Sequence, residues 1–306
     1  MKLINSIKEI ASNEKIFFTI GNFDGVHLGH RQFLKFIKDE AQKVGARFLV
    51  ITFVPHPSFV LKNQRAFLLN TYNERREMLK ELGVEYLFEI DFNRDFSTLS
   101  PGDFLDNYIF NHPGITKMFL GHDFAFGANK SGDFNFVKDY CANRKIDLLI
   151  QDEYKFMSSN VSSSAVRGHV KSGDMDLASN LLGRNYFISG RVIKGAGRGK
   201  QIGFPTANLG YERECLVPSN GVYITKTYFK EMTYQSVTNV GHNPTFNTGL
   251  DIHVETHLLD FNSDIYGEEI RVEFIKKLRD EKKFSSANEL IQQIKTDVEN
   301  SRKYFS

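Results

Sequence analysis

Residues 21–31 read G-N-F-D-G-V-H-L-G-H-R and follow the apolar run I-F-F-T-I at 16–20. A helical pattern comes directly afterwards, so the stretch is predicted to be a strand, a tight turn and a helix start. Glycines let the backbone approach a ligand, and the free N–H groups of a new helix favour phosphate. His27 and His30 share one helical face. The stretch predicts a nucleotide site where two imidazoles and an arginine stabilise a transferring phosphoryl group.

Length and composition narrow the class of protein. The 306 residues predict two domains, and 39 basic against 37 acidic residues give no signal for nucleic acid or a membrane surface. Cys141 and Cys215 are far apart, which argues against a zinc site or disulfide framework and predicts inert thiols in a reducing cytoplasm. Residues 1–13 lack an apolar signal core. A cytoplasmic protein is expected, with self-association left open.

Strands and helices alternate in the first half. Short apolar runs predict strands at 17–20, 48–53, 86–90, 117–120 and 146–150. Helices are expected from His27, over 72–82, and after Ser100 as N-cap with Pro101 in the first turn. This order predicts an α/β, Rossmann-like domain with a parallel sheet, whose ligands lie beyond the carboxyl ends of the strands.

Three further segments are expected at the same edge. Residues 52–57, T-F-V-P-H-P, predict an extended loop whose His56 faces phosphates, the alternative being a solvent histidine. Residues 121–127, G-H-D-F-A-F-G, predict a loop that closes over a flat ring, or else a turn with core aromatics. Residues 161–167 place a serine run at the start of a short helix and Arg167 near its first turn, which predicts a second anion site.

The second half changes in pattern. A capped helix over 174–183 ends on glycine, and strands are expected at 186–193, 221–229, 235–240, 253–259 and 269–275. These predict a small antiparallel barrel, with domains at 1–184 and 185–306. A last helix is expected to begin with a capping box of Ser286 and Glu289 and to pack an apolar stripe into the core. The stripe consists of Leu290, Ile291, Ile294 and Val298.

Residues 195–208, G-A-G-R-G-K-Q-I-G-F-P-T-A-N, form the second concentrated signal. Four glycines with Arg198 and Lys200 predict a flexible basic loop around a triphosphate, the alternative being an RNA-binding or linker loop. Thr206 and Asn208 stand two apart, so in an extended segment both face one side and offer oxygen ligands to Mg²⁺.

The ordered motifs resemble those of the bacterial bifunctional riboflavin kinase/FMN adenylyltransferases. The first half matches their G-x-F-D-G-x-H-x-G-H, P-H-P, G-x-D-F-x-F-G and S-S-x-x-x-R series, and the P-T-A-N stretch resembles the riboflavin kinase signature. The likeness continues through N-G-V-Y at 220–223, N-P-T at 243–245, V-E-T-H at 254–257, D-I-Y-G at 264–267 and L-R-D-E-K-K-F at 278–284. It covers nearly the whole second domain.

The resemblance implies site residues for both activities. For the adenylyltransferase, the ATP site is Gly21, Phe23, Asp24, His27, His30, Ser163, Ser164 and Arg167, with His27, His30 and Arg167 catalytic, and the FMN site is His56, Pro57, Asp123, Phe124 and Phe126. For the kinase, the ATP site is Gly195, Gly197, Arg198, Gly199, Lys200, Gly203, Pro205, Thr206 and Asn208, the last two holding Mg²⁺, and the flavin site is Arg279, Glu281 and Phe284.

A kinase that phosphorylates a neutral ribityl hydroxyl needs a base, and the resemblance assigns that role to Glu255. The bland alternative is a surface glutamate on a strand. The resulting hypothesis is a bifunctional enzyme that makes FMN from riboflavin and ATP, then FAD and pyrophosphate from FMN and a second ATP. Two rivals stay open at this point: a nucleotidyltransferase for another phosphate ester with a flavin-sensing barrel, and a regulator that binds flavin or RNA without turnover.

Overall fold

The structure is a computed structural model that describes residues 1–306 apart from 122–123, 153, 157–158, 196 and 243–251. The chain forms two compact units. The first comprises Met1–Arg65 with Tyr72–Ser162, and the second comprises Ala66–Thr71 with Ser163–Ser306. A division of the two activities at residue 184 stays a prediction.

A six-stranded sheet in the order β1-β4-β3-β2-β5-β6 organises the first unit, and all of its neighbouring strands are parallel. Its strands are β1 (Lys2–Ile4), β2 (Ile16–Ile20), β3 (Arg47–Val54), β4 (Tyr86–Asp91), β5 (Ile115–Gly121) and β6 (Asp147–Gln151). The predicted α/β class is thereby confirmed. The edge strand β1 was not predicted, because three residues are too few to show a period.

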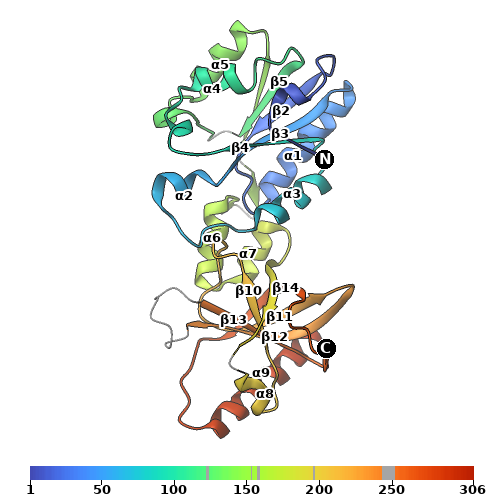
Figure 1. The fold of residues 1–306 in the computed structure, drawn as a ribbon, viewed down its shortest axis with the longest axis vertical. Coiled ribbons are helices and arrows are strands. Elements are labelled where there is room, and N and C mark those ends of the chain that lie inside the picture. Colours follow the sequence, from blue (N-terminus) through green and yellow to red (C-terminus); the bar gives the residue numbers. More distant parts are fainter. Residues whose placement is uncertain (122–123, 153, 157–158, 196, 243–251) are drawn as a thin grey trace. The chain divides into compact units, whose positions relative to one another are not determined.

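Helices cover both faces of this sheet. Figure 1 shows α1 (Leu28–Lys43) and α3 (Tyr72–Glu81) on one side and α4 (Pro101–Tyr108) and α5 (Phe134–Asn143) on the other. Successive strand residues face opposite layers: Phe17 packs with the α1 core, and Phe18 packs with the α4 and α5 core. The remaining elements are α2 (Pro57–Lys62), η1 (Ile7–Glu9), η2 (Phe96–Thr98), η3 (Ala128–Lys130) and the short pair β7 (Lys155–Phe156) and β8 (Ser159–Asn160).

The strand order reverses between β2 and β5. From β2 the chain adds β3 and β4 on one side, and β5 and β6 then lie on the other side. Ligands of open α/β sheets bind beyond the carboxyl ends of strands at such a switch point. The loop that begins at Gly21 leaves β2 at this place, between the segments that follow β3 and β5.

The second unit contains a closed antiparallel barrel in the order β10-β13-β12-β11-β14-β9. Its strands are β9 (Tyr186–Ile193), β10 (Ala207–Tyr211), β11 (Gly221–Phe229), β12 (Met232–His242), β13 (Ile252–Leu258) and β14 (Glu269–Arg279). The barrel was predicted, but β10 was missed, because it is short and contains Gly210. Fully buried hydroxyls hydrogen-bond to one another in the barrel: Thr225, Thr227, Ser236, Thr238 and Thr256.

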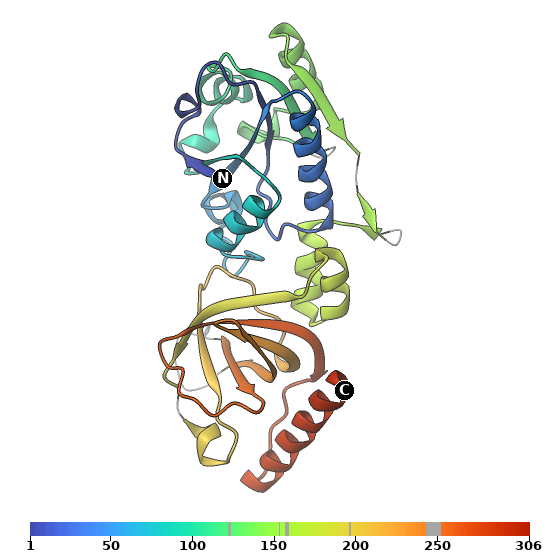
Figure 2. The same ribbon diagram turned by 90° about the vertical axis from the view of Figure 1, so that its right-hand side faces the viewer.

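The described residues of the second unit also form the helices α6 (Ser163–Ser172), α7 (Met175–Leu182), α8 (Arg198–Gln201) and α9 (Ala287–Phe305). Helix α7 ends as predicted, with Gly183 left-handed at φ 68°. Figure 2 shows α9 beside the barrel. Ser286 caps α9, but the Glu289 carboxylate accepts from Ser285 rather than completing the predicted box. The predicted apolar stripe of α9 is only half-buried, whereas Asp297 and Ser301 are buried.

Both cysteines are buried, and burial raises the pKa of Cys141 to about 11, in line with an inert thiol. In the part of the chain that the structure describes, no helix is both long and apolar enough to cross a lipid bilayer.

Candidate active sites

The loop after β2 adopts an unusual backbone. Phe23 and Val26 have φ values of 49° and 38°, and Gly25 has φ 82°. Left-handed geometry costs a side chain about 1–3 kcal/mol and persists only where the surroundings enforce it. Asp24 is 3% exposed, so this carboxylate is enclosed rather than solvated. The predicted tight turn is therefore present and is held in place by its neighbours.

His27 and His30 meet at the start of α1. Their rings stack with centroids 3.6 Å apart, and the edge of the Phe23 ring lies against His30 at 5.1 Å. His27 is the N-cap, because its Nδ1 accepts the His30 backbone N–H at 3.3 Å. A nitrogen that accepts carries no proton, so neutral His27 has its proton on Nε2 and can donate from there. The structure thus brings both histidines together at a helix N-terminus.

The P-H-P segment differs from its prediction. It begins helix α2 instead of forming an extended loop, with Pro57 at the first position and His56 as N-cap. His56 Nδ1 accepts the Ser58 N–H at 3.1 Å, and the His56 N–H donates to the Tyr72 hydroxyl at 2.8 Å. His56 is 6% exposed, so the alternative of a histidine in solvent is wrong, and contact of His56 with phosphates stays a prediction.

The aromatic residues after β5 differ in how deeply they are buried. Phe126 is buried in the core and packs against Phe104 with ring centroids 5.5 Å apart. Phe124 is half-buried and stacks on Phe126 at 5.5 Å. For Phe126 the structure has the turn with core aromatics that the sequence left open. Asp123 lies outside the described residues.

Ser163 and Ser164 begin α6, which belongs to the second unit. Arg167, on the same helix, is 8% exposed. Its Nε donates to the Phe67 carbonyl at 2.9 Å, and its guanidinium lies 3.6 Å from the centre of the Phe67 ring. The roles of these residues at the adenylyl site stay predictions.

The predicted base and metal ligands of the kinase come together where β10 pairs with β13, with Thr206 directly before β10. Asn208 is the direct register partner of Glu255, and Thr206 Oγ1 lies 3.5 Å from Glu255 Oε2. Val254, Thr256 and Leu258 are buried, so alternation places Glu255 on the outer face of the barrel. The set of hydroxyl, amide and carboxylate oxygens suits Mg²⁺. Among the described residues there is no cluster of three or more His, Cys, Asp or Glu able to hold a metal.

The glycine-rich segment contains a helical turn that was not predicted, α8 at residues 198–201. The Phe204 N–H donates to the Gly199 carbonyl at 2.8 Å. A Cβ at Gly199 would overlap the Phe204 carbonyl, and one at Gly195 would overlap the Asn208 amide. The segment therefore packs against Asn208 at Gly195, and at Gly199 it leaves no room for a side chain.

The three predicted flavin residues of the kinase lie at and after the end of β14. Arg279 is held by Asp297 of α9, with contacts of 2.9–3.1 Å, and its guanidinium is 5.8 Å from the Phe284 ring. The Glu281 carboxylate accepts from Asn220 at 3.2 Å. A Cβ at Gly241 would lie 2.8 Å from Glu281 Oε1, which places this carboxylate against β12.

Two neighbours of the sites were not found from the sequence. Asn239 on β12 is the register partner of Glu255 on the side opposite Asn208. Arg75 on α3 is buried and donates to the Asn22 carbonyl in the loop after β2. The sequence signal for Asn239 is its outward position on a predicted strand. The signal for Arg75 is its position three residues after Tyr72 and four before Leu79, which places it on the buried face of α3.

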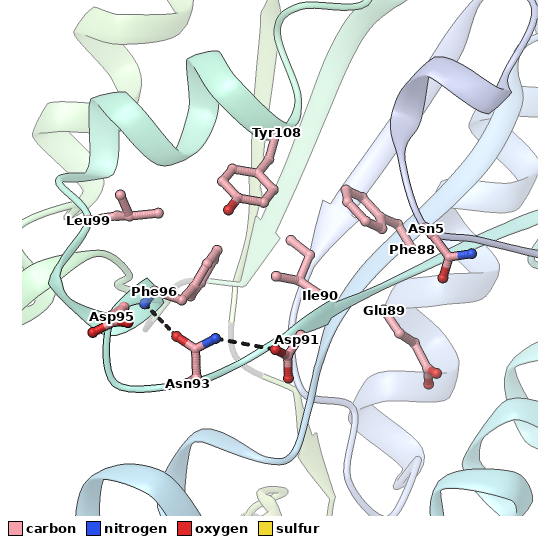
Figure 3. A pocket seen from close by; sticks show the side chains of 10 residues that line it. All are labelled: Asn5, Phe88, Glu89, Ile90, Asp91, Asn93, Asp95, Phe96, Leu99 and Tyr108. Carbon is pink, nitrogen blue, oxygen red and sulfur yellow. Dashed lines mark hydrogen bonds between the residues drawn. The ribbon is translucent and has the colours of Figure 1, made fainter.

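A cavity of about 540 Å³ opens beside β4, and none of the predicted site residues lines it (Figure 3). The Asn93 amide donates to Asp91 at 3.2 Å across its floor. Its lining is Asn5, Phe88, Glu89, Ile90, Asp91, Asn93, Asp95, Phe96, Leu99 and Tyr108. The Glu89 carboxylate points away from the Phe96 and Tyr108 rings.

Comparison with known proteins assigns the two halves separately. Residues 9–165 match the family model for FAD synthetase, and residues 182–305 match that for riboflavin kinase. A solved structure described as a macrolide-efflux protein from Streptococcus pneumoniae has the same fold, with a TM-score of 0.87 and 30% identity over 98% of both chains.

Two curated relatives are called bifunctional riboflavin kinase/FMN adenylyltransferase. The protein of Bacillus subtilis is 36% identical over 296 residues, which cover 95% of this chain and 93% of the relative. The protein of Escherichia coli is 35% identical over 309 residues, which cover 100% and 98%. Both matches extend through the two units, and the chain therefore belongs to the bifunctional riboflavin kinase/FMN adenylyltransferase family.

Proposed function

We propose that this chain makes FMN from riboflavin and ATP in its barrel and makes FAD and pyrophosphate from FMN and a second ATP in its N-terminal domain. Matches to both family models and to full-length relatives support the two activities. The observation that carries the proposal is the pairing of Asn208 with Glu255 beside Thr206, which supports the proposed roles of Glu255 as base and of Thr206 and Asn208 as oxygen ligands.

In the kinase reaction Glu255 takes the proton of the terminal ribityl hydroxyl. The hydroxyl oxygen then attacks the γ-phosphorus of ATP, the bond to the β-phosphate oxygen breaks, and ADP leaves. The position of Glu255 on the outer face of the barrel leaves its carboxylate half-buried, so substrate can reach it. Arg279, Glu281 and Phe284 are proposed to contact the flavin.

Mg²⁺ is proposed to be held by Thr206 and Asn208 together with the phosphates of ATP. The residues fit the ion, because a hydroxyl and an amide oxygen next to a carboxylate form a hard donor set. Bound Mg²⁺ would neutralise charge on the phosphates. The glycines of residues 195–203 are proposed to let the backbone follow the triphosphate, with Arg198 and Lys200 supplying positive charge.

In the adenylyl transfer an FMN phosphate oxygen attacks the α-phosphorus of ATP, and pyrophosphate leaves. The phosphate is already an anion, so this step needs charge stabilisation rather than a base. His27 and His30 are proposed to donate to the oxygens of the reacting phosphorus from the N-terminus of α1. Ser163, Ser164 and Arg167 are proposed to bind the remaining phosphates, and His56, Pro57 and Phe124 to contact FMN.

A cytoplasmic location is part of the proposal, since neither cysteine is in a disulfide. Product analysis tests the whole proposal: purified protein receives riboflavin, ATP and Mg²⁺, and the flavins are separated over time. FMN should appear first and FAD should follow with one pyrophosphate per FAD. A flavin sensor would leave riboflavin unchanged, and a transferase for another phosphate ester would make no FAD.

A further inference from the structure

Arg75 on helix α3 is one of the largest fully buried side chains of the first unit, at 2% exposure. A charged group at this depth persists only when it is paired and hydrogen-bonded. Its Nη2 donates to Glu89 Oε1 of β4 at 3.0 Å, and its Nη1 donates to the Asn22 carbonyl at 3.0 Å. One guanidinium therefore joins a helix, a strand and the loop of the nucleotide site.

Asp24 adds a second link to the same loop. Burial lowers the pKa of Arg75, whereas Glu89 and then Asp24 favour its charged form. The Arg75 guanidinium also lies 5.0 Å from the centre of the Tyr72 ring. Arg75 thus contacts the loop through the Asn22 carbonyl and is attracted electrostatically by the Asp24 carboxylate.

The loop needs such an anchor. Phe23 follows Asn22 directly and has positive φ, as does the β-branched Val26. Positive φ at such residues is retained only where surrounding contacts enforce it. The Asn22 carbonyl accepts from Arg75 and, at a longer 3.4 Å, from Thr52 Oγ1. These donors fix the carbonyl immediately before the first strained residue.

Helix α3 also holds the second motif, because the Tyr72 hydroxyl accepts the His56 N–H at 2.8 Å. Arg76, next to Arg75, offers a natural contrast. Its guanidinium pairs with the other Glu89 oxygen, Oε2, and its Nη1 donates to Asn73 at 2.7 Å. Both arginines share one carboxylate, and the loop contact distinguishes them.

We propose that Arg75 is a positioning residue for the adenylyl transfer, because its two-armed fork holds the Asn22–Asp24 turn in the geometry that receives the nucleotide. The inference rests on the proposed adenylyltransferase activity. Among the described contacts, Arg75 has none with His27 or His30. Its effect on the site is proposed to pass through the backbone of the loop.

The experiment compares Arg75→Lys with Arg76→Lys in the full-length protein. Lysine keeps the charge but loses the planar fork with which Arg75 reaches Asn22 and Glu89 from two separate nitrogens. FAD formation from FMN is measured over a range of ATP concentrations, and FMN formation from riboflavin is measured on the same samples. We expect kcat/KM for ATP in FAD formation to fall by about 10- to 100-fold in Arg75→Lys. The KM for FMN, and all kinase parameters, should change little.

Arg76→Lys should match the parent in both reactions. Thr52→Val, which removes the weaker donor to Asn22 and preserves shape, should raise the KM for ATP in FAD formation by a smaller amount. If Arg75→Lys does not fold, the ATP kinetics of Thr52→Val test the inference in its place. Equal ATP kinetics in Arg75→Lys and Arg76→Lys, equal losses in both activities, or an unchanged Thr52→Val beside an unfolded Arg75→Lys would overturn the inference. A parent protein that makes no FAD would instead refute the proposed function.

Discussion

The two sites hold their side chains in different ways. Around the loop after β2, Asp24, His27 and Arg75 are all at most 5% exposed. Arg75 is held by hydrogen bonds to Asn22 and Glu89, and His27 accepts the His30 backbone N–H. In the barrel, Asn208 and Glu255 are half-buried, and strand register sets their positions. Preorganised dipoles stabilise charge best in an enclosed site, whereas a base must reach its substrate. The contrast matches the two nucleophiles proposed, a phosphate anion and a neutral alcohol.

This contrast predicts how far the effect of a substitution extends beyond the substituted residue. A change at the barrel surface should remove one chemical function and leave the fold intact, because register comes from backbone hydrogen bonds. A change in the enclosed site should disturb neighbours that share its hydrogen bonds. The predictions that follow test these expectations, starting with the largest effect.

The largest effect is expected for Glu255→Gln. Glutamine keeps size and much of the hydrogen bonding but cannot accept the ribityl proton, so FMN formation should fall by about 10²- to 10⁴-fold. FAD formation from added FMN should stay near the parent rate. Both products are measured with riboflavin or FMN as the starting flavin. Loss of FAD synthesis from FMN in a folded mutant would refute the model of two independent sites.

His30→Ala tests the enclosed site. Removal of one preorganised donor should lower kcat for FAD formation by about 10²-fold, with little change in FMN affinity. Supplied with riboflavin, this mutant should accumulate FMN. The rate at saturating FMN and the FMN affinity are measured separately. If FMN binding were lost while kcat held, the assignment of His30 to the transition state would be wrong.

The barrel also contains an enclosed charge pair, Arg279 with Asp297, and we expect it to act on stability. Asp297 is 3% exposed, and Asp297→Ala leaves Arg279 without its carboxylate. Unfolding of the barrel should become easier by about 3 kcal/mol, the low end for a broken buried pair because Arg279 keeps some exposure. Denaturant unfolding measures the change.

Asp260→Ala is the matched control for that pair. Asp260 binds Arg302 of the same helix α9 at 2.6 and 2.8 Å, but both partners are solvent-exposed. Solvent screens such a pair, so its loss should leave the unfolding midpoint unchanged. Equal destabilisation in the two mutants would show that burial does not distinguish these pairs.

The sequence predicted the layout of both units better than the side-chain environments. Apolar runs and glycine caps placed the parallel sheet, the barrel and α7. The kinase prediction for Thr206 and Asn208 depended on alternation along an extended segment, whereas that for Glu255 came from the family resemblance. The pairing of β10 with β13 does bring these residues together. A period of two along an extended segment is a local property, so it is visible in sequence.

Contacts between distant segments were harder to predict. P-H-P gave no sign that His56 caps a helix and binds Tyr72, and Phe126 looked like a ligand residue although it fills the core. Arg75 was not predicted because charged residues are rarely buried unless they are paired, and nothing in the sequence indicates its partners. Its partners, Asn22 and Glu89, lie on a loop and a strand elsewhere in the chain.

The smallest change in activity is expected for Asn208→Ala, which tests the open character of the kinase site. If Asn208 supplies one oxygen to Mg²⁺, its loss should raise the half-saturating Mg²⁺ concentration for FMN formation by about tenfold. The effect should be no larger, because Mg²⁺ keeps several waters and binds phosphate oxygens of ATP as well. The Mg²⁺ dependence of FAD formation from FMN, measured on the same mutant, serves as the control and should not shift. A purely structural role for Asn208 against Gly195 would lower FMN formation at every Mg²⁺ concentration, whereas a ligand's loss is offset by excess Mg²⁺. An unchanged Mg²⁺ titration would remove the assignment of Asn208 as a ligand.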